Sequence, residues 1–408
     1  DLVRLHTGPE DPLPGLTDAE RKAYLAAISY ERYLRADLGL GADAYDYVRR
    51  ATNPLFGVDA DRVPAADAWA VGCPGFGALG LTGAPWPGAS LTARMALAET
   101  EDDGFIYFPD GNASVARLLL ARLVPEAFPG EPGMSGIVTA RARYDRLDRP
   151  DSPVRVRLGA TVYDVRHDDA PGNSREVAIR YRTARGDHEV RAGHVVMACW
   201  TSVTSHVLRG LPGEQAEAMR YGVKVPLVYA RAAVRDWTAF AAAGVSRVDT
   251  PTMYWDGFRL PPPTRLGDYT SARDPELPTV VHLAKTPNEP GLPLKEQYRA
   301  GREHLQAVTF ATLERELRDT MARALGPYGF DPGRDIAAIT VNRWAHGYAY
   351  EYTSLDDADV LSRAPDDRPN ALARRPFGRI AIPGSDAAAF AYTHAAIDEA
   401  HRAVTDLA

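Results

Sequence analysis

The apolar and polar residues near the N-terminus follow a helical period. Thr17 and Glu20 form a capping-box pattern, apolar residues follow at helical spacing, and Gly39 suits the end of a helical stretch. Further along, SVARLLLARLV at 114–124 has the spacing of an amphipathic helix that a proline stops. The apolar run FIYF at 105–108 precedes it and is typical of a strand. We therefore expect a helical layer and then a unit of strand, turn and helix.

The middle of the chain changes to a period of two. Three runs alternate apolar and polar residues: VRVRL at 154–158, EVAIRYR at 176–182 and EVRAGHVVMA at 189–198. Between the last two runs, Arg185-Gly186-Asp187 is typical of a hairpin turn. This pattern predicts a sheet.

The second half of the chain mixes both periods. We predict a strand over 223–234, a helix over 294–325, a strand over 339–352 and a closing strand, RIAI, at 379–382. A last helix follows and has one face made of Ile397, Ala400, Val404 and Leu407. No repeat recurs, and helices and strands alternate irregularly, so the predicted fold class is α/β of the mixed α+β type.

Composition and charge narrow the classes of protein. The chain has 408 residues, 45% hydrophobic and 25% charged, which indicates a globular protein large enough for two domains. Its longest apolar stretches, such as 68–81 and 380–391, are shorter than the ~18–20 residues that span a bilayer, so no transmembrane helix is predicted. The net charge of −7, without a basic run, argues against nucleic acid and mildly favours cationic partners.

The cysteines and the first residue say little about the compartment. Only Cys73 and Cys199 are present, which excludes a disulfide framework and a CxxC metal or redox site. The sequence begins with Asp1 and has no signal-like segment, so we expect that processing or truncation removed the true start. Periplasmic and cytoplasmic locations both stay open.

A dinucleotide fingerprint is missing from these residues. No G-x-G-x-x-G lies between a strand and a helix with an acidic residue ~20 positions later. The nearest glycine cluster, Gly72 to Gly77, follows no clear strand and contains a proline, which favours a packed loop. We therefore expect an N-terminal segment or a second chain to supply the fingerprint.

Four separated blocks give the chain a family resemblance. They are FPDGNASVARLLLARLVP at 108–125, ACWTSV with RYGVKVPLVYA within 198–230, VNRWAHGYAYEY at 341–352, and GRIAIPGSDAAAFAYTHAAIDEAHRAV at 378–404. Together they resemble the FAD-dependent spermidine dehydrogenases, within the wider flavin amine oxidase family. The first hundred residues resemble that family less sharply.

The resemblance implies two interleaved domains. An FAD-binding Rossmann-like domain of the amine oxidase type, incomplete in this chain, would take 105–200 as its middle segment and 376–408 as its C-terminal segment. A substrate domain of mixed sheet and helices would take 201–375, with 1–104 as its helical and loop part. The two cofactor-like segments are expected to meet across the substrate domain.

The closing block carries the expected FAD contacts. A carboxylate at the end of a strand can accept hydrogen bonds from ribityl hydroxyls, and by resemblance Gly384, Ser385 and Asp386 bind FAD. Thr393 and His394 would lie near the isoalloxazine ring, where a helix start favours negative charge. An ordinary turn with Asp386 as a helix cap is the alternative.

Two more segments are implied to contact the cofactor. Gly111 and Asn112 open a helix directly after a strand, where a bare backbone can approach a planar ring, and the family has this turn beside the flavin. Val162 resembles the residue whose backbone bonds adenine. A plain turn and a plain core strand are the alternatives.

Lys224 and the aromatic block are the expected catalytic residues. In the family, a lysine that matches Lys224 holds a water near flavin N5, whereas a salt-bridged edge lysine is the alternative. In an unbroken strand, Trp344, His346, Tyr348, Tyr350 and Tyr352 share one face, which can hold an amine, and Glu351 points the other way.

His346 can also relay a proton, and Tyr350 and Trp255 are expected to contact the substrate. An aromatic core face with a hydrogen-bonded histidine is the alternative. Gly347 can break the alternation, so which of these side chains face the flavin stays open.

The expected reaction is oxidation of the C–N bond of a polyamine such as spermidine. Hydride transfer to FAD needs no protein nucleophile, and the imine would hydrolyse to an aldehyde and a shorter amine. A distal carboxylate should hold the second ammonium, and the candidates are Glu101, Asp102, Asp103 and Asp256. Some relatives also carry haem b, for which no axial ligand can be assigned.

Other functions remain alternatives. The chain could be a non-catalytic flavoenzyme-like subunit of a split complex, because the fingerprint is missing. It could also be a desaturase-like enzyme or an amino-acid oxidase, and the latter needs a buried arginine such as Arg343.

Overall fold

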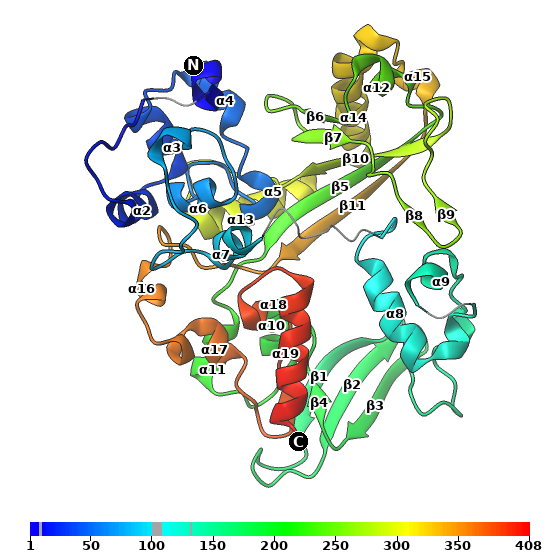
Figure 1. Cartoon of the computed structure of the whole chain (residues 1–408). Helices are drawn as coiled ribbons and strands as arrows, with labels where there is room; N and C mark the ends of the chain where they lie inside the picture. The colour runs from blue at the N-terminus through cyan, green and yellow to red at the C-terminus, as the bar shows by residue number, and fades with distance from the viewer. Residues whose placement is uncertain (8–9, 100–107, 131–132) are drawn as a thin grey trace.

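The N-terminal region is helical in the computed structural model, which describes residues 1–7, 10–99, 108–130 and 133–408 (Figure 1). The predicted capping box is confirmed, because Glu20 N–H donates to the Thr17 hydroxyl and the Glu20 carboxylate accepts from Thr17 N–H. The helices of this region are α1 Leu2–Thr7, α2 Asp18–Ala26, α3 Tyr30–Arg32, α4 Ala42–Val48, α5 Asn53–Phe56, α6 Ala65–Ala70 and α7 Leu91–Ala98.

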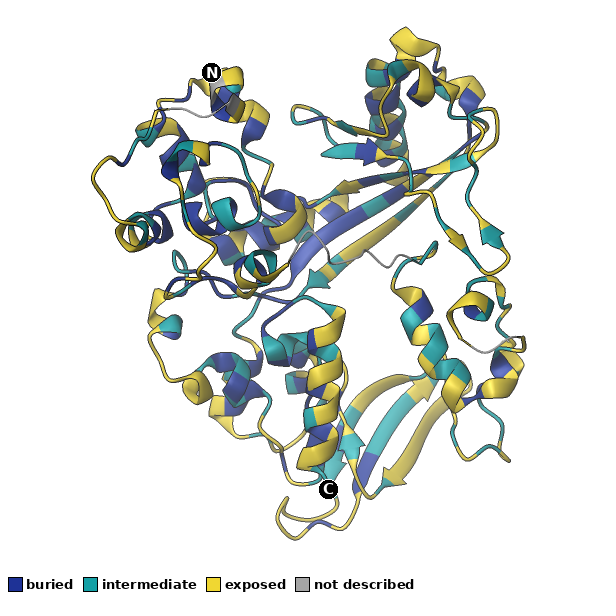
Figure 2. Cartoon of the chain, viewed as in Figure 1, coloured by how far each residue is buried: buried dark blue, intermediate teal, exposed yellow. Residues whose placement is uncertain are grey.

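A five-stranded antiparallel sheet forms the centre of the molecule (Figure 1). Its order is β11-β5-β10-β7-β6, and the long strand β5 lies between β11 and β10. Most residues of β5 are buried, which matches its apolar sequence (Figure 2). The bounds are β5 Val225–Val234, β6 Arg247–Asp249, β7 Gly257–Arg259, β10 Thr279–Lys285 and β11 Ile336–Tyr348.

Helices cover this sheet and bury a core with it. Trp255, Leu283 and Leu313 belong to that core. The prediction of one helix over 294–325 is wrong, because the chain leaves the helix at Val308 and the Thr309 hydroxyl caps a new one. We call the sheet and its helices the five-stranded half: α12 Thr238–Ala243, α13 Leu294–Ala307, α14 Phe310–Leu325 and α15 Pro332–Asp335. The small hairpin of β8 Arg265–Leu266 and β9 Tyr269–Thr270 adjoins α9 Met134–Thr139.

The N-terminal helices share a second core with the five-stranded half. This core joins side chains of α2 to α6 with the start of β5, with α13 and with the aromatic residues Tyr350 and Tyr352. Residues before position 104 therefore pack against residues after position 220.

A three-stranded antiparallel sheet lies apart from the first one (Figure 1). It consists of β1 Thr161–His167, β2 Val177–Thr183 and β3 Gly186–Ala192. The predicted strand VRVRL at 154–158 is wrong: these residues pair with no strand, and Val154 and Val156 pack on Leu147 instead. The hairpin turn is also displaced, because Gly186 pairs with Thr183 within the ladder.

A short parallel pair connects distant parts of the chain. β4 Val195–Val196 pairs with β12 Ile380–Ala381, so the segment before residue 198 contacts the segment after residue 376, as the two cofactor-like segments were expected to do. Their assignment to one domain stays a prediction. The helices around this pair are α8 Ala113–Leu123, α10 Thr201–Val207, α11 Gly213–Met219, α16 Ala358–Leu361, α17 Pro369–Ala373, α18 Ser385–Ala388 and α19 Thr393–Asp406.

We call β1 to β4, β12, α8, α18 and α19 the three-stranded half. The helix predicted over 114–124 is confirmed as α8, whereas residues 105–107 of the FIYF run lie outside the described residues. On α19, Ile397 and Val404 are exposed, while Glu399 is buried, so the predicted apolar face is not the packed one.

The mixed α/β fold class is confirmed by this arrangement of helices and sheets. Within the described residues, no helix combines the length and the apolar character needed to cross a membrane.

Candidate functional site

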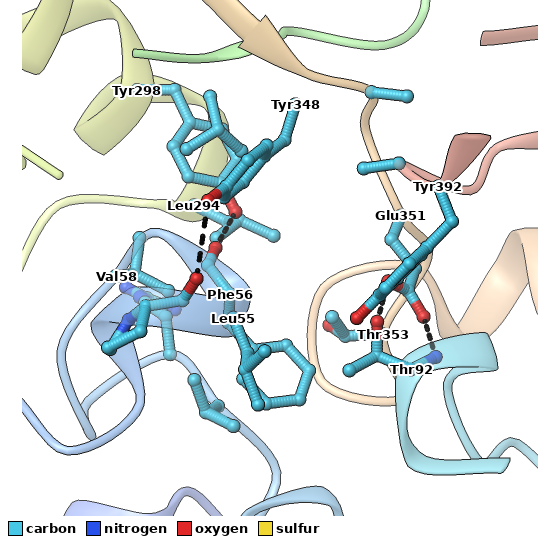
Figure 3. Close-up of a pocket in the computed structure, with 16 residues that line it drawn as sticks. Leu55, Phe56, Val58, Thr92, Leu294, Tyr298, Tyr348, Glu351, Thr353 and Tyr392 are labelled. Carbon is cyan, nitrogen blue, oxygen red and sulfur yellow. Dashed lines mark hydrogen bonds between the residues drawn. The ribbon is translucent and has the colours of Figure 1, made fainter. Parts of the chain in front are cut away.

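A cavity of about 170 Å³ lies where the N-terminal helices meet the five-stranded half (Figure 3). Residues of α5, the start of β5, α13 and the end of β11 contribute its apolar wall. The lining side chains that carry the argument below are Phe56, Tyr298, Tyr348, Tyr392, Thr92 and Glu351. The cavity therefore combines aromatic walls with one carboxylate.

Two tyrosines on one wall are fixed by hydrogen bonds. Tyr298 donates its hydroxyl to Phe56 O at 2.9 Å, and the hydroxyls of Tyr348 and Tyr229 lie 3.1 Å apart. Tyr348 is also 3.4 Å from Pro54 O. Burial raises the pKa of both Tyr298 and Tyr348, so these phenols stay neutral.

Glu351 lies on the opposite side of the cavity, beside Tyr392 (Figure 3). Its carboxylate accepts the backbone N–H of Thr92 at 2.6 Å and the Thr92 hydroxyl at 2.7 Å. The side chain is partly exposed, and it lines the cavity. Burial raises the pKa of Glu351, whereas the Thr92 bonds oppose that shift.

A second carboxyl group, Asp67, lies behind this wall, close enough for its charge to interact with that of Glu351. Asp67 is fully buried, and its Oδ1 accepts from the backbone N–H of Ser90 at 3.4 Å. Its Oδ2 has no hydrogen-bond partner among the described residues. Burial, and then the charge of Glu351, raise the pKa of Asp67 to about 7. The two carboxyl groups thus repel each other behind the cavity surface.

Next to the cavity, Lys224 forms an ion pair with Asp386. Lys224 Nζ lies 2.8 Å from Asp386 Oδ1, and Asp386 Oδ2 accepts from the backbone N–H of Thr201 at 3.3 Å. Both residues of the pair are largely buried. Val225, which directly follows Lys224 in the sequence, lines the cavity, so the ion pair adjoins the cavity.

His346 stacks on Trp200, with ring centroids 4.2 Å apart. The Arg302 guanidinium lies 6.0 Å from the Trp200 ring and donates to Ala345 O at 3.1 Å and to Lys224 O at 3.4 Å. Partial burial and then the charges of Arg302 and Lys224 lower the pKa of His346. The imidazole is therefore neutral at neutral pH and can accept a proton.

A bulge near the end of β11 produces this arrangement. Trp344 pairs with Leu227 and Tyr348 pairs with Val225, so four steps on β11 match two steps on β5. A side chain at Gly347 would collide with Leu227, which explains glycine at this position. The strand predicted over 339–352 therefore ends earlier, at Tyr348, and its alternation of side chains is broken near Gly347, which the sequence had left open.

The loop between α18 and α19 adjoins both groups of residues. Ala389 has φ of +52°, and it is the one non-glycine residue with positive φ among those described. Ala391 and Tyr392 of this loop line the cavity. Asn112 Nδ2 lies 3.2 Å from the Thr393 hydroxyl, so two residues predicted for the cofactor are in contact. The positive φ of Ala389 is a form of local backbone strain, which is typical of functional sites.

The other predicted site residues are dispersed. His394 lies near the rings of Phe390 and Tyr392, and Val162 is exposed on β1. Gly111, with φ of +72°, precedes α8, and Gly384 and Ser385 begin α18.

Three of the aromatic predictions lie away from the cavity. Trp344 is 53% exposed, and Trp255 is fully buried in the core of the five-stranded half. Tyr350 donates to buried Asp357 at 2.9 Å.

Of the carboxylates predicted to bind a second ammonium, only Asp256 lies within the described residues. Asp256 is already close to two cations, Arg50 at 3.4 Å and Lys285 at 3.6 Å. Glu101, Asp102 and Asp103 lie outside the described residues.

Sequence reasoning missed Glu351, Asp67, Thr92 and Tyr392. The available signal for Glu351 was a single charge between two tyrosines, but an unbroken strand turns it away from Tyr348. The signal for Asp67 was a lone acid in the segment AADAWA. Neither signal indicates that the two acids approach each other.

Comparison with known proteins identifies the fold. No protein-family model and no curated protein matches the chain. A double mutant of putrescine oxidase with redesigned cofactor binding aligns over 100% of this chain and 72% of its own, with 14% identity and a TM-score of 0.54. Wild-type putrescine oxidase bound to putrescine aligns over the same shares, with 14% identity and a TM-score of 0.53. At this identity the likeness shows a shared fold.

Proposed function

We propose that the chain is the substrate-binding part, and much of the cofactor-binding part, of an FAD-dependent enzyme that oxidises the C–N bond of a polyamine such as spermidine. The observation that carries the proposal is the aromatic cavity with Glu351 in its wall, one residue along the chain from the Lys224–Asp386 pair. An ammonium group is attracted both by a carboxylate and by aromatic faces, the latter by ~0.5–2 kcal/mol. The fold shared with putrescine oxidase supports the same reaction class.

The residues around Asp386 fit FAD. A carboxylate has about four acceptor positions, and Asp386 uses two of them for Lys224 and Thr201, which leaves room for ribityl hydroxyls. Space is also free at Gly384 and Gly111, where an added Cβ would meet nothing within 4 Å. In the proposal Asn112, Ser385, Thr393 and His394 border the cofactor, and Val162 contacts its adenine.

Bound FAD would supply the acceptor for a hydride from the carbon next to the amine nitrogen. The chain's own residues would bind the amine, exclude water and accept the proton that the substrate ammonium must lose first. His346 can take that proton because its lowered pKa leaves the imidazole unprotonated at neutral pH. Water then converts the released imine to an aldehyde and a shorter amine, and oxygen or another two-electron acceptor takes the electrons.

Lys224 would hold an ordered water near the reacting atoms. Its ammonium is buried and paired with Asp386, so it is fixed in position. A lysine with a purely structural ion pair is the alternative, and only a kinetic measurement distinguishes the two.

A phosphate-binding fingerprint from outside these 408 residues completes the proposal. It would come from an N-terminal segment or from a second chain. Exposed apolar residues on the three-stranded half, such as Val196 and Leu123, offer a surface for it. Haem b is not part of the proposal, since no described contact supports it.

Anaerobic bleaching of flavin tests the proposed function. The purified protein, with any polypeptide that accompanies it and with added FAD, is mixed with spermidine, putrescine or amino acids. We expect the amines to bleach the yellow absorption, and amino acids to leave it unchanged. Bleaching by amino acids alone would favour the amino-acid oxidase. No bound flavin under any condition would favour the non-catalytic subunit.

The Asp386→Ala variant tests whether Asp386 binds the cofactor. Loss of a carboxylate bonded to a hydroxyl removes about 1.5–3 kcal/mol, so flavin should dissociate about 10- to 100-fold more readily. Asp256→Ala, which removes an aspartate paired with Lys285, should leave flavin retention unchanged. Equal flavin content in both variants after dialysis would contradict the assignment of Asp386.

A further inference from the structure

One cross-strand row of the five-stranded sheet is basic. Arg231 of β5 pairs with His282 of β10, which also pairs with Arg259 of β7. Arg259 in turn pairs with Arg247 of β6. These four strands are neighbours in the sheet (Figure 1). Residues that face each other across antiparallel strands point to the same side of a sheet, so the four side chains share one face.

This face of the sheet is opposite to the one that the helices cover. Val281 and Phe258, which are adjacent to the row in the sequence, point the other way and belong to the core that includes Leu313 of α14. Arg231 and Arg259 are exposed, and His282 is partly buried between them. A ligand can therefore reach the row.

Arg231 and Arg259 lack a carboxylate partner. Among the described residues, no acidic side chain lies at ion-pair distance from either arginine. The residues next to the two arginines and His282 along these strands, on the same face, are uncharged: Tyr229, Ala233, Val280, Ala284 and Gly257. Like charges close together on one face of a sheet are unfavourable, so an anion bound between the arginines would relieve their repulsion.

His282 provides a further donor at the centre of the row. Burial and then the charges of Arg231 and Arg259 lower the pKa of His282 to about 4. The imidazole is therefore neutral at neutral pH, and one ring nitrogen still carries a hydrogen that an anion can accept. Thr340 of β11, which pairs with Arg231, adds an exposed hydroxyl on the same face.

We propose that Arg231 and Arg259, on either side of His282, bind a phosphate group. Neighbouring strands are about 4.8 Å apart, so the Cα atoms of the two arginines are about 10 Å apart, and their long side chains can converge on one ligand. Each guanidinium fork matches two oxygens of a phosphate. A carboxylate has only two oxygens in all, whereas a phosphate has enough for both forks and for the imidazole.

The phosphate site lies near the cavity and shares no residue with it. Tyr229, two residues from Arg231 on the same face, has its hydroxyl 3.1 Å from that of Tyr348, which lines the cavity. Neither of the two arginines lines it. Phosphate binding can therefore be measured without flavin or amine, so the phosphate site and the proposed function can fail separately.

Calorimetric titration with inorganic phosphate at constant ionic strength is the first test. The wild type should bind saturably, with a Kd of about 1 mM or below. Arg231→Gln and Arg259→Gln should each weaken binding by about 10-fold or more, because each removes charged hydrogen bonds to the ligand.

Arg247→Gln is the matched control from the same row. Arg247 is already engaged, because its Nε donates to Asp249 at 2.9 Å, so its loss should change the Kd by less than about 2-fold. Absence of saturable binding by the wild type, or an equal loss in all three variants, would show only general attraction of anions to a positive surface and would overturn the proposal.

A second measurement uses the wild type alone, so it does not depend on the folding of any variant. Phenylglyoxal modifies exposed arginines, and mass spectrometry of peptides locates each modified residue. Inorganic phosphate should slow modification of Arg231 and Arg259 and leave that of Arg247 unchanged. Equal rates with and without phosphate at all three positions would contradict the site.

Glycerol phosphate distinguishes the source of the phosphate group in the same experiment. Protection of the two arginines at a lower concentration of glycerol phosphate than of inorganic phosphate would support the site and indicate a larger phosphomonoester as its ligand. The reverse order would support the site and indicate free phosphate.

Discussion

The two halves of the molecule bury their residues to very different degrees (Figure 2). In the five-stranded half, β5 is buried along most of its length and Leu313 and Leu317 of α14 are fully buried. In the three-stranded half, β3 is exposed nearly throughout, and Leu123 of α8 is 54% exposed. The first half can thus be stable by its own packing, whereas the second half presents surfaces that a further polypeptide or a cofactor can cover.

The largest expected effect compares one leucine from each half. Leu317→Ala empties part of a packed core and should lower the free energy of unfolding by about 2–5 kcal/mol. Leu123→Ala, on an exposed helix face, should change it by less than about 0.5 kcal/mol. Urea denaturation measures both. Similar losses for the two variants would remove the distinction between the halves.

The next comparison concerns two of the lysine–aspartate pairs among the described residues. Lys224→Met deletes the charge beside Asp386, and we expect saturating amine to reduce flavin about 100-fold more slowly. Lys285→Met deletes the charge beside Asp256 and should affect stability but not the rate of flavin reduction. Stopped-flow absorption measures that rate. A rate within a few-fold of wild type for Lys224→Met would make Lys224 structural.

Asp67 gives a smaller effect that depends on pH. Its pKa is about 7 in the folded protein and near 3.8 when unfolded, so the folded state alone keeps the proton between these values. Stability is therefore lost as pH rises from about 4 to 7. Asp67→Asn removes this loss, and the variant should be more stable than wild type by on the order of 2 kcal/mol at pH 8 and equal to it near pH 4. Thermal melts across this range measure the difference, and parallel pH profiles would contradict the assignment.

The smallest expected effect lies in the three-stranded half, where ion pairs hold α19. Buried Glu399 pairs with Arg374 and Arg402. Glu399→Gln should lower stability by about 1–2 kcal/mol and open α19 locally. Hydrogen exchange should then accelerate for α19 amides and not for β5 amides. Equal acceleration in both elements would mean that the halves unfold as one unit.

The sequence predicted which helices and strands form more accurately than it predicted where they begin and end. Periodicity identified the helix α8, the strand β5 and the capping box at Thr17, because each depends on neighbouring residues. It failed at the Val308–Thr309 break and at 154–158, because tertiary packing and the absence of a partner strand decided those segments.

The sequence predicted only part of the candidate site. Tyr348 lines the cavity, and Lys224 contacts Asp386, so three residues chosen from the sequence lie close together. Glu351 was missed because the bulge before Tyr348 changes which side chains share a face. The approach of Asp67 to Glu351 joins positions far apart in the sequence, which no local pattern can indicate.

The parallel pair of β4 and β12 has a consequence for the order of folding. Val195 pairs with Ile380, 185 positions later (380 minus 195), and each strand contributes only two residues. Closing so long a loop is entropically unfavourable until the intervening chain is compact. The five-stranded half should therefore fold first, and its folding should bring the two strands together. Assembly of the region beside Asp386 would then report that the cavity-bearing half has already folded.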